Sequence, residues 1–260
     1  MTVCAFVEWP EDLRPSGPVW DSIRHSLDKA APDLLVTNEL PFGRWIASAE
    51  KFDAEAARKS MDAHDEGIIA LRSLGIGAVI SSRPVLSGDR LANEAFVLEH
   101  EQIRALHRKQ LFPNEEGWYE ARWYEGDENG FEIHEIAGLK VGILLCTELM
   151  FNEHARHYGR AGADLIAVPR ASGTANARWT TAAAMAAIVS GSYVVSSNRS
   201  GQSQPGPLFG GNGMAFAPDG TLIAATSAES SIATISIDTN ATARQKKEYP
   251  CYVPELPVRC

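Results

Sequence analysis

The sequence contains no apolar run that approaches the roughly 20 residues of a membrane-spanning helix. Its N-terminus, MTVCAFVEWPEDLRP, lacks the basic residues that begin a signal peptide and soon turns polar. No internal repeat and no low-complexity linker divides the chain. We therefore expect a single domain over residues 1–260, located in the cytoplasm, whose proline-containing tail forms an irregular arm over about residues 243–260.

Basic residues are too few and too scattered for a nucleic-acid-binding protein. The chain carries 24 Lys and Arg against 33 Asp and Glu, which gives a net charge of −9. Its densest basic segments, RALHRKQ and ARQKKEY, are short. Nucleic acids and anionic membranes are bound by clustered Lys and Arg. The composition therefore argues against a nucleic acid or an anionic membrane as the partner of this protein.

Cysteine is sparse, and the cysteines that are present lie far apart. They are Cys4, Cys146, Cys251 and Cys260. Their spacing matches neither a disulfide framework nor a cysteine-rich metal site. This pattern indicates a reducing compartment, in agreement with a cytoplasmic location.

Apolar runs rich in β-forming residues alternate with helical patterns along the chain. The sequence predicts a hairpin over residues 131–146 with Ala137 and Gly138 at its turn. Strands alternating with helices are typical of an α/β protein, and paired antiparallel segments among them indicate mixed sheets. The other expected strands are residues 2–9, 34–39, 77–85, 92–106, 163–169 and 193–198, with further strands around residues 213–226 and 231–238. The expected helices are residues 19–30, 53–73, a segment from about 151, and 177–191.

Three reactive side chains follow apolar strands, at the point where each strand ends. Glu39 ends LLVTNE, Lys109 follows FVLEHEQIRAL, and Cys146 ends VGILL. Ligands of open α/β sheets gather outside the carboxyl ends of the strands, so these side chains are candidates for one cleft. Taken singly, each has an ordinary explanation, because a strand-end Glu or Lys is usually solvated and an apolar-flanked Cys is usually inert.

A carboxylate, an ammonium and a thiol in one cleft are sufficient for acyl transfer. A thiol attacks a carbonyl group as the thiolate, so Cys146 needs a base, and Glu39 can accept its proton. Lys109 supplies positive charge beside the oxygen that becomes an oxyanion, and the backbone N–H of Thr147 supplies a second donor. This chemistry needs neither a metal nor another cofactor.

Three motifs in this order resemble the nitrilase superfamily of carbon–nitrogen hydrolases. They are TNELPFG, HRKQLFP and LLCTELMFNEHAR, and the resemblance continues through ARWTTAAAMAAIVSGSYVVSSNRSG and FAPDGTLIAAT. It implies a four-layer α-β-β-α sandwich with two mixed sheets, and a homodimer. It also implies a Glu39–Lys109–Cys146 triad that hydrolyses a carbon–nitrogen bond outside peptides, in a small linear amide or N-carbamoyl compound. Cys146 is then expected on a tight turn from strand to helix, exposed to substrate.

Members of this superfamily often carry a second glutamate between the lysine and the cysteine. Glu120 fits their pattern, because the aromatic residues Trp123 and Tyr124 follow it after two positions. Glu116, in EGWY, matches a shorter version of the pattern and stays open as the alternative. We take Glu120 as the fourth catalytic residue. The candidate substrate-binding residues are Thr147, Glu116, Trp123, Glu148 and Arg170.

Arg170 is a candidate because it follows the strand DLIAVP, at another carboxyl end near the strand of Cys146. Its planar guanidinium could clamp a substrate carboxylate through two hydrogen bonds. An ion pair with an acidic residue of a nearby loop is the equal alternative.

A nitrilase and a non-catalytic binding protein of the same fold are the first alternatives. A nitrile also reaches the acid through a thioester, so the triad alone does not separate nitrilase from amidase. In nitrilases the nucleophilic cysteine tends to be followed by Trp and Glu, whereas in this chain Cys146 is followed by Thr147 and Glu148. We therefore favour an amidase or carbamoylase. The presence of glutamate, lysine and cysteine together argues against a protein that only binds.

A metal site is the remaining alternative. His154 and His157 lie three positions apart, on one face of an expected helix, with Glu148 and Glu153 nearby. Catalytic zinc needs three protein ligands, and the sequence offers no second cluster. We therefore expect a polar helix face here and no metal.

Overall fold

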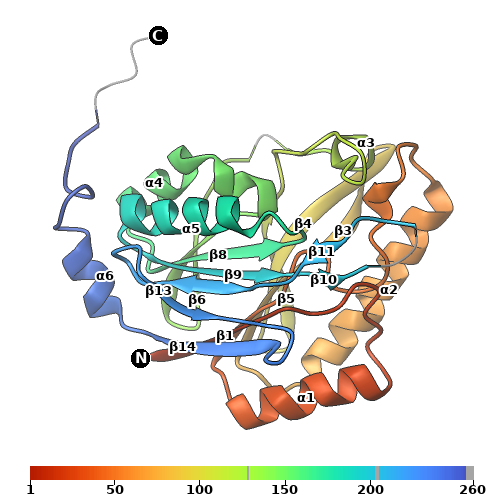
Figure 1. Ribbon diagram of the computed structural model, residues 1–260, viewed down its shortest axis with the longest axis horizontal. Helices are drawn as coiled ribbons and strands as arrows, with labels where there is room; N and C mark the ends of the chain where they lie inside the picture. The colour runs from red at the N-terminus through yellow and green to blue at the C-terminus, as the bar shows by residue number, and fades with distance from the viewer. Residues whose placement is uncertain (128, 203–204, 256–260) are drawn as a thin grey trace.

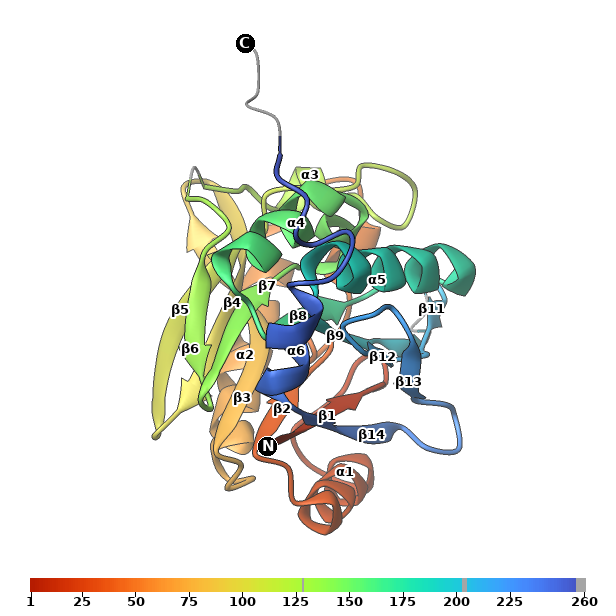
Figure 2. The same ribbon diagram turned by 90° about the vertical axis from the view of Figure 1, so that its left-hand side faces the viewer.

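Two mixed sheets lie face to face in the computed structural model, which describes residues 1–127, 129–202 and 205–255. Helices cover the outer face of each sheet, so the molecule has four layers (Figures 1 and 2). The predicted four-layer α-β-β-α sandwich is confirmed.

The first sheet has six strands in the order β14-β1-β2-β3-β4-β5. Strands β1, β2 and β3 run parallel, and the other neighbours pair antiparallel. Helices α1 (Pro18–Ala30) and α2 (Ala54–Arg72) cover its outer face. Pro18 starts α1, and the Asp53 side chain caps α2 by accepting two backbone N–H groups. The strands are β1 (Thr2–Val7), β2 (Leu34–Val36), β3 (Ala78–Ser87), β4 (Arg90–Glu99), β5 (Gln102–Arg108) and β14 (Ile232–Ile237).

The second sheet also has six strands, in the order β13-β12-β9-β8-β7-β6. Strands β7, β8 and β9 run parallel, and the outer neighbours pair antiparallel. Helices α4 (Asn152–Ala161) and α5 (Asn176–Ser190) cover its outer face. The strands are β6 (Ile133–Ile136), β7 (Leu139–Ile143), β8 (Leu165–Arg170), β9 (Tyr193–Asn198), β12 (Met214–Phe216) and β13 (Leu222–Ala225).

Short elements complete the described chain. Two of them, the 3-10 helix η2 (Cys146–Met150) and helix α3 (Glu120–Trp123), contain predicted site residues. The others are η1 (Ile46–Ser48), β10 (Ser200–Gly201), β11 (Phe209–Gly210) and α6 (Thr239–Gln245).

The alternation of side chains along β1 supplies two apolar layers. Cys4 and Phe6 point into the layer between the sheets, whereas Ala5 and Val7 point into the layer beneath α1 and α2. A third apolar layer lies between the second sheet and helices α4 and α5. The strands with both faces buried therefore read as continuous apolar runs in the sequence.

Most expected elements are present, and one is wrong. The segment 92–106 is not one strand, because the chain reverses at His100 and Glu101 to form the hairpin of β4 and β5. Both turn residues have positive φ (51° and 63°), although neither is glycine or asparagine. The alternation of apolar and polar residues in ANEAFVLEHEQIRAL continues through this turn, so the sequence pattern does not reveal the turn.

The C-terminal arm follows α6, a helix that the sequence analysis does not predict and that ends at Gln245. Beyond it, Arg156 of α4 holds the arm by donating to the carbonyl oxygens of Pro250, Cys251 and Val253. Residues 256–260, with Cys260, lie outside the described part of the chain.

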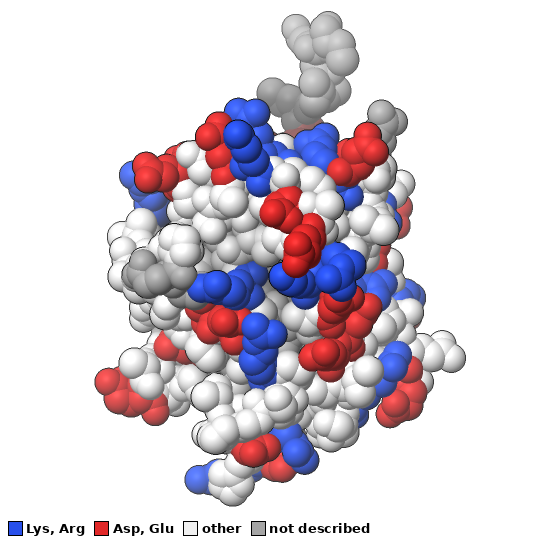
Figure 3. Space-filling model, turned by 90° about the vertical axis from the view of Figure 1, so that its right-hand side faces the viewer, with Lys and Arg blue, Asp and Glu red and all other residues white. Residues whose placement is uncertain are grey.

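On the face shown in Figure 3, basic and acidic side chains of the described residues lie next to one another rather than in separate patches. Among the described helices, none is long and apolar enough to cross a membrane.

Candidate active site

The three residues predicted as a triad lie just beyond the ends of β2, β5 and β7. Glu39 and Lys109 come from the first sheet, and Cys146 comes from the second. Glu39 and Lys109 are 0% exposed and Cys146 is 3% exposed. All three follow strands whose carboxyl ends lie at the same side of the sandwich, as expected from the sequence.

Lys109 lies between two carboxylates. Its Nζ donates to Glu39 Oε1 at 2.8 Å and to Glu120 Oε2 at 2.6 Å. Burial opposes the charge of the ammonium, but Glu120, Glu39 and Cys146 outweigh it and raise the pKa of Lys109 well above its usual value. Lys109 is therefore a fixed positive charge at neutral pH.

Each of the two glutamates keeps one oxygen without a hydrogen-bond partner. These atoms are Glu39 Oε2 and Glu120 Oε1, both buried. The other oxygen of Glu39 is shared by Lys109 and by Asn93 Nδ2, which donates at 2.8 Å. Burial raises the pKa of Glu120 to about 7, although Lys109 favours its ionised form. Buried unpaired oxygens are uncommon in proteins, so these two are available to a substrate or to a proton.

Cys146 occupies the tight turn that is expected after β7, where it is the first residue of η2. Its φ is 49°, in the left-handed region that a residue with a Cβ seldom adopts. Its Sγ lies 3.7 Å from the carbonyl oxygen of Ala171. Burial and the charge of Glu39 raise the pKa of the Cys146 thiol, and Lys109 opposes the rise. The thiol is therefore protonated at rest, and it lies deeper than the exposed position expected.

The two residues after the nucleophile differ in burial. Thr147 is partly buried. Glu148 is fully buried and turns back into the protein, where its carboxylate accepts from the His107 ring and from the backbone N–H groups of Gln110 and Leu145.

Two further substrate-binding candidates, Glu116 and Trp123, make no hydrogen bond to Lys109 in the described part of the chain, unlike Glu120. Glu116 is exposed on the loop before α3. Trp123 is buried, packs on Phe52 at 5.2 Å, and donates its Nε1–H to the carbonyl oxygen of Ala49 at 2.6 Å.

Arg170 is fully buried and is bonded to neutral partners rather than to an acid. Its guanidinium donates to the side chains of Ser196 and Ser172 and to the carbonyl oxygen of Asn212, at 2.7 to 3.0 Å. It also lies over the ring of Trp179 at 5.0 Å. Burial lowers the pKa of Arg170 to about 10. All three of its nitrogens therefore have partners within the protein.

Asn93 is the residue at this site that the sequence analysis missed. It lies on β4, is fully buried, and holds Glu39 as described above. Its signal in the sequence is an asparagine inside an apolar strand pattern, where this residue type is depleted.

In the described ranges, no group of three or more His, Cys, Asp and Glu side chains could hold a metal ion. His154, one of the two histidines considered as ligands, stacks on Phe131 with ring centroids 3.7 Å apart. The ring of His157 lies 6.1 Å from that of Tyr158.

Comparison with known proteins gives matches over most of the chain. Residues 40–247 match the family model described as Carbon-nitrogen hydrolase. A glutamine-dependent NAD(+) synthetase of Xylella fastidiosa is 36% identical over 105 residues, which are 40% of this chain and 19% of that protein. An N-carbamoylputrescine amidase of Solanum lycopersicum is 26% identical over 160 residues, 58% of this chain and 51% of that one. The chain thus spans about a fifth and about half of these relatives' lengths.

A carbon–nitrogen hydrolase from Helicobacter pylori G27 has the same fold. Its crystal structure superposes with a TM-score of 0.83 at 20% sequence identity, over 96% of this chain and 94% of that one.

Proposed function

We propose that this chain, which belongs to the carbon–nitrogen hydrolase family, hydrolyses a small linear amide or N-carbamoyl compound through a thioester on Cys146. Its resemblance to the nitrilase superfamily is confirmed at the level of the family. One observation carries the proposal. Lys109 is hydrogen-bonded to Glu39 and Glu120 in a buried site where each glutamate keeps a free oxygen, and a thiolate at Cys146 would act on the same lysine.

In the first step the proton of the thiol moves to Glu39 as sulfur attacks the carbonyl carbon. The C–S bond forms while the carbonyl π bond opens, and the oxygen becomes an oxyanion. Lys109 and the backbone N–H of Thr147 stabilise that oxyanion. The raised pKa of the Cys146 thiol supports this order, because a thiol that is protonated at rest needs a base at the moment of attack.

In the second step the oxyanion collapses and the carbon–nitrogen bond breaks. Glu39 gives its proton to the departing nitrogen, which leaves as an amine or ammonia, and the acyl group stays on Cys146. Glu39 then takes a proton from water, whose oxygen attacks the thioester. The C–S bond breaks, the acid leaves, and the proton returns to sulfur. No metal and no cofactor enters this sequence.

Glu120 is proposed as the second active-site glutamate in place of Glu116. It contacts the lysine directly, and its free Oε1 is suited to accept an N–H of an amide. Glu116, by contrast, is exposed.

For Trp123, Glu148 and Arg170 the placement supports roles inside the protein rather than contact with substrate. Each side chain already bonds to neighbouring protein groups. Thr147 remains the proposed oxyanion donor. The homodimer and the cytoplasmic location stay predictions.

The proposal is tested by measuring ammonia release from a panel of primary amides, N-carbamoyl compounds and nitriles, with Cys146→Ala as the blank. Turnover of an amide or carbamoyl compound, with an acyl adduct on Cys146 after rapid quenching, is expected. Turnover of nitriles alone would assign the nitrilase reaction instead. Binding without turnover of any class would leave a non-catalytic protein of this fold.

A further inference from the structure

The residues proposed to act together belong to different sheets. Glu39 and Lys109 follow strands of the first sheet, and Cys146 follows β7 of the second. The sheets meet through an apolar layer, and apolar packing has little directionality. Directional bonds at the carboxyl ends of the strands are therefore needed to hold Lys109 at a fixed place relative to Cys146.

The Glu148 carboxylate makes such bonds. Oε1 accepts from the backbone N–H of Gln110 at 2.7 Å, and Oε2 accepts from the backbone N–H of Leu145 at 2.8 Å. His107 Nε2 lies 3.0 Å from Oε1 and 2.9 Å from Oε2. Because both oxygens already accept backbone N–H groups, the carboxylate acts as the acceptor and His107 carries its hydrogen on Nε2.

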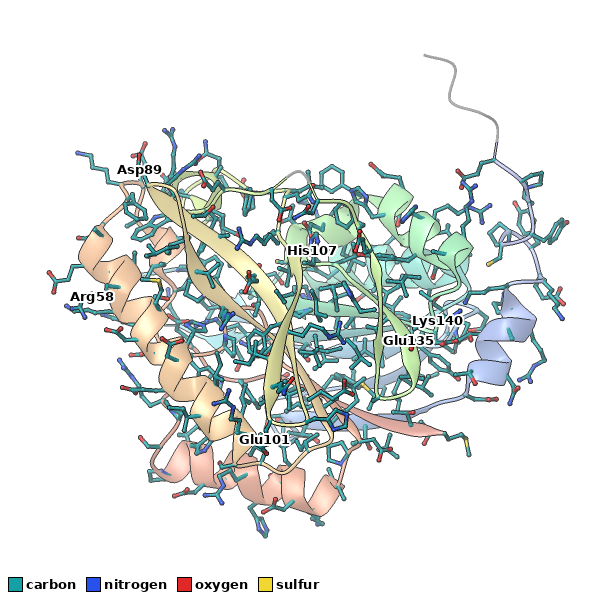
Figure 4. The ribbon with its side chains drawn as sticks, turned by 180° about the vertical axis from the view of Figure 1, so that it is seen from behind. Arg58, Asp89, Glu101, His107, Glu135 and Lys140 are labelled. Carbon is teal, nitrogen blue, oxygen red and sulfur yellow. The ribbon has the colours of Figure 1, made fainter. Side chains whose placement is uncertain are left out.

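The residues of these three donors are close to Lys109 or Cys146 in the sequence. His107 and Gln110 lie on either side of Lys109 in the first sheet, and Leu145 directly precedes Cys146 in the second. Figure 4 shows His107 near the end of β5, beside the strands of the second sheet. One carboxylate therefore joins the chain around the lysine to the chain around the nucleophile.

The Glu148 carboxylate accepts the first backbone N–H group beyond the regular strand pairing in each sheet. The N–H of Lys109 still pairs with β4, through Asn93 O at 2.9 Å, and the next N–H goes to Glu148. In the second sheet Leu144 N still pairs with Ala167 O at 3.0 Å, and again the next N–H goes to Glu148. Loss of the carboxylate would leave two backbone donors unpaired at the site, which proteins avoid.

We propose that Glu148, oriented by His107, is a positioning residue that fixes Lys109 relative to Cys146. This inference rests on the proposed function, and it replaces the expectation that Glu148 binds substrate. Glu148 is 0% exposed and acts through the backbone on both sides. Its effect falls on the chemical step and on the reactivity of the thiol, not on substrate affinity.

The test begins with three histidine variants. His107→Phe keeps an aromatic ring beside Phe131, whose ring centroid lies 4.8 Å from that of His107, but it removes the donor to Glu148. His107→Gln keeps a donor near the position of Nε2. His154→Phe is the matched control, because His154 stacks on the same Phe131 ring and bonds through its ring to no oxygen in the described structure. Measurements are kcat, KM, the melting temperature, and the rate at which iodoacetamide alkylates Cys146, followed by peptide mass.

His107→Phe is expected to lower both kcat and the alkylation rate by about 10- to 100-fold with little change in KM, which is the scale of a 1 Å misplacement. His107→Gln restores most of each rate, and His154→Phe leaves both unchanged. Glu148→Gln is expected to lower kcat and the alkylation rate at least as far as His107→Phe does, because its amide cannot accept hydrogen bonds from all three donors. Combined with His107→Phe it adds little, because the two residues act as one unit.

Equal kcat and alkylation rates in His107→Phe and the wild type, with a lower melting temperature alone, would assign Glu148 a purely structural role and overturn the proposal. So would an equal loss in His154→Phe. The alkylation rate needs no substrate. If the wild type hydrolyses no amide while alkylation of Cys146 still depends on His107, the proposed function fails and the positioning role stands.

Discussion

Lys109 Nζ and Glu120 Oε2 lie 2.6 Å apart, and neither side chain reaches solvent. A second carboxylate, Glu39, contacts the same ammonium, so the site holds one more acid than base. Two buried carboxylates compete for a single positive charge, and one of them binds a proton more readily than usual. Burial, together with the charge of Glu39, raises the pKa of Glu120 to about 7 although Lys109 opposes the rise, and this leads to the first prediction.

Glu120→Gln should change how stability depends on pH. The folded pKa of Glu120, about 7, lies above its ordinary value of 4.5. A carboxyl group whose pKa is raised on folding stabilises the folded state. This contribution is fully present below the unfolded pKa and is lost as the pH rises through the folded pKa. The wild type should therefore lose stability relative to Glu120→Gln between pH 4.5 and 7. Melting temperatures of both proteins across this range check it, and a constant difference contradicts it.

Cys146→Ala should fold and have no turnover, because no neighbouring side chain replaces the thiolate. Cys251→Ser serves as control, since Cys251 lies in the C-terminal arm, 3.3 Å from the carbonyl oxygen of Ile188. It should keep wild-type activity. Ammonia release and the mass of the quenched protein are the measurements. Activity above a trace in purified, folded Cys146→Ala would show that the thioester mechanism is wrong.

Glu39→Gln should reduce kcat by roughly 10²- to 10⁴-fold through loss of the general base. Asn93→Ala should have a smaller effect in the same direction, because Asn93 only holds the carboxylate. The kcat of each variant, measured at saturating substrate, distinguishes the two effects. An Asn93→Ala variant as slow as Glu39→Gln would mean that the amide contacts substrate.

Arg170→Lys should raise KM equally for an acidic substrate and for its neutral analogue. Each of its three guanidinium nitrogens donates to a protein group, namely Ser196, Ser172 or Asn212, and the side chain is fully buried, so the guanidinium is held inside the protein. A lysine cannot form this fork, and unfolding by urea should show a loss of about 1–3 kcal/mol. A selective rise in KM for the acidic substrate would restore the clamp hypothesis.

One acyl group offered both as amide and as nitrile should be hydrolysed faster as the amide, by a wide margin in kcat/KM. An amide nitrogen needs a hydrogen-bonded position and a proton, and Glu120 Oε1 is available beside Lys109 for the first of these. Glu120→Gln should remove most of the margin. A better nitrile substrate, or an equal loss for both, would assign the nitrilase reaction.

The sequence predicts most strands and the strand-end positions of Glu39, Lys109 and Cys146 because both follow from short-range patterns, whereas the four layers are predicted from the resemblance to a known family. Apolar runs of β-branched residues mark the buried strands, and a polar residue after such a run marks a carboxyl end. Glu39, Lys109 and Cys146 each stand at such a point. The turn at His100 and Glu101 escapes prediction, since it contains no glycine, proline or asparagine and the alternation continues through it.

The partners of Glu148 and Arg170 could not be predicted, because they depend on which strands become neighbours. His107 and Glu148 are 41 residues apart in the chain, and Arg170 and Ser196 are 26 apart. A strand-end Arg or Glu in the sequence is equally compatible with a ligand contact and with an internal bond. Only the pairing of β8 with β9 and the approach of β5 to β7 decide between them.

Division of the catalytic groups between two sheets has a consequence for the newly made protein. The residues up to 123 supply Glu39, Lys109 and Glu120, and Cys146 belongs to the half of the chain that follows. A chain in which only one sheet has formed holds either Glu39 without Cys146 or Cys146 without Glu39. On the proposed mechanism, reactivity arises only when the two sheets dock.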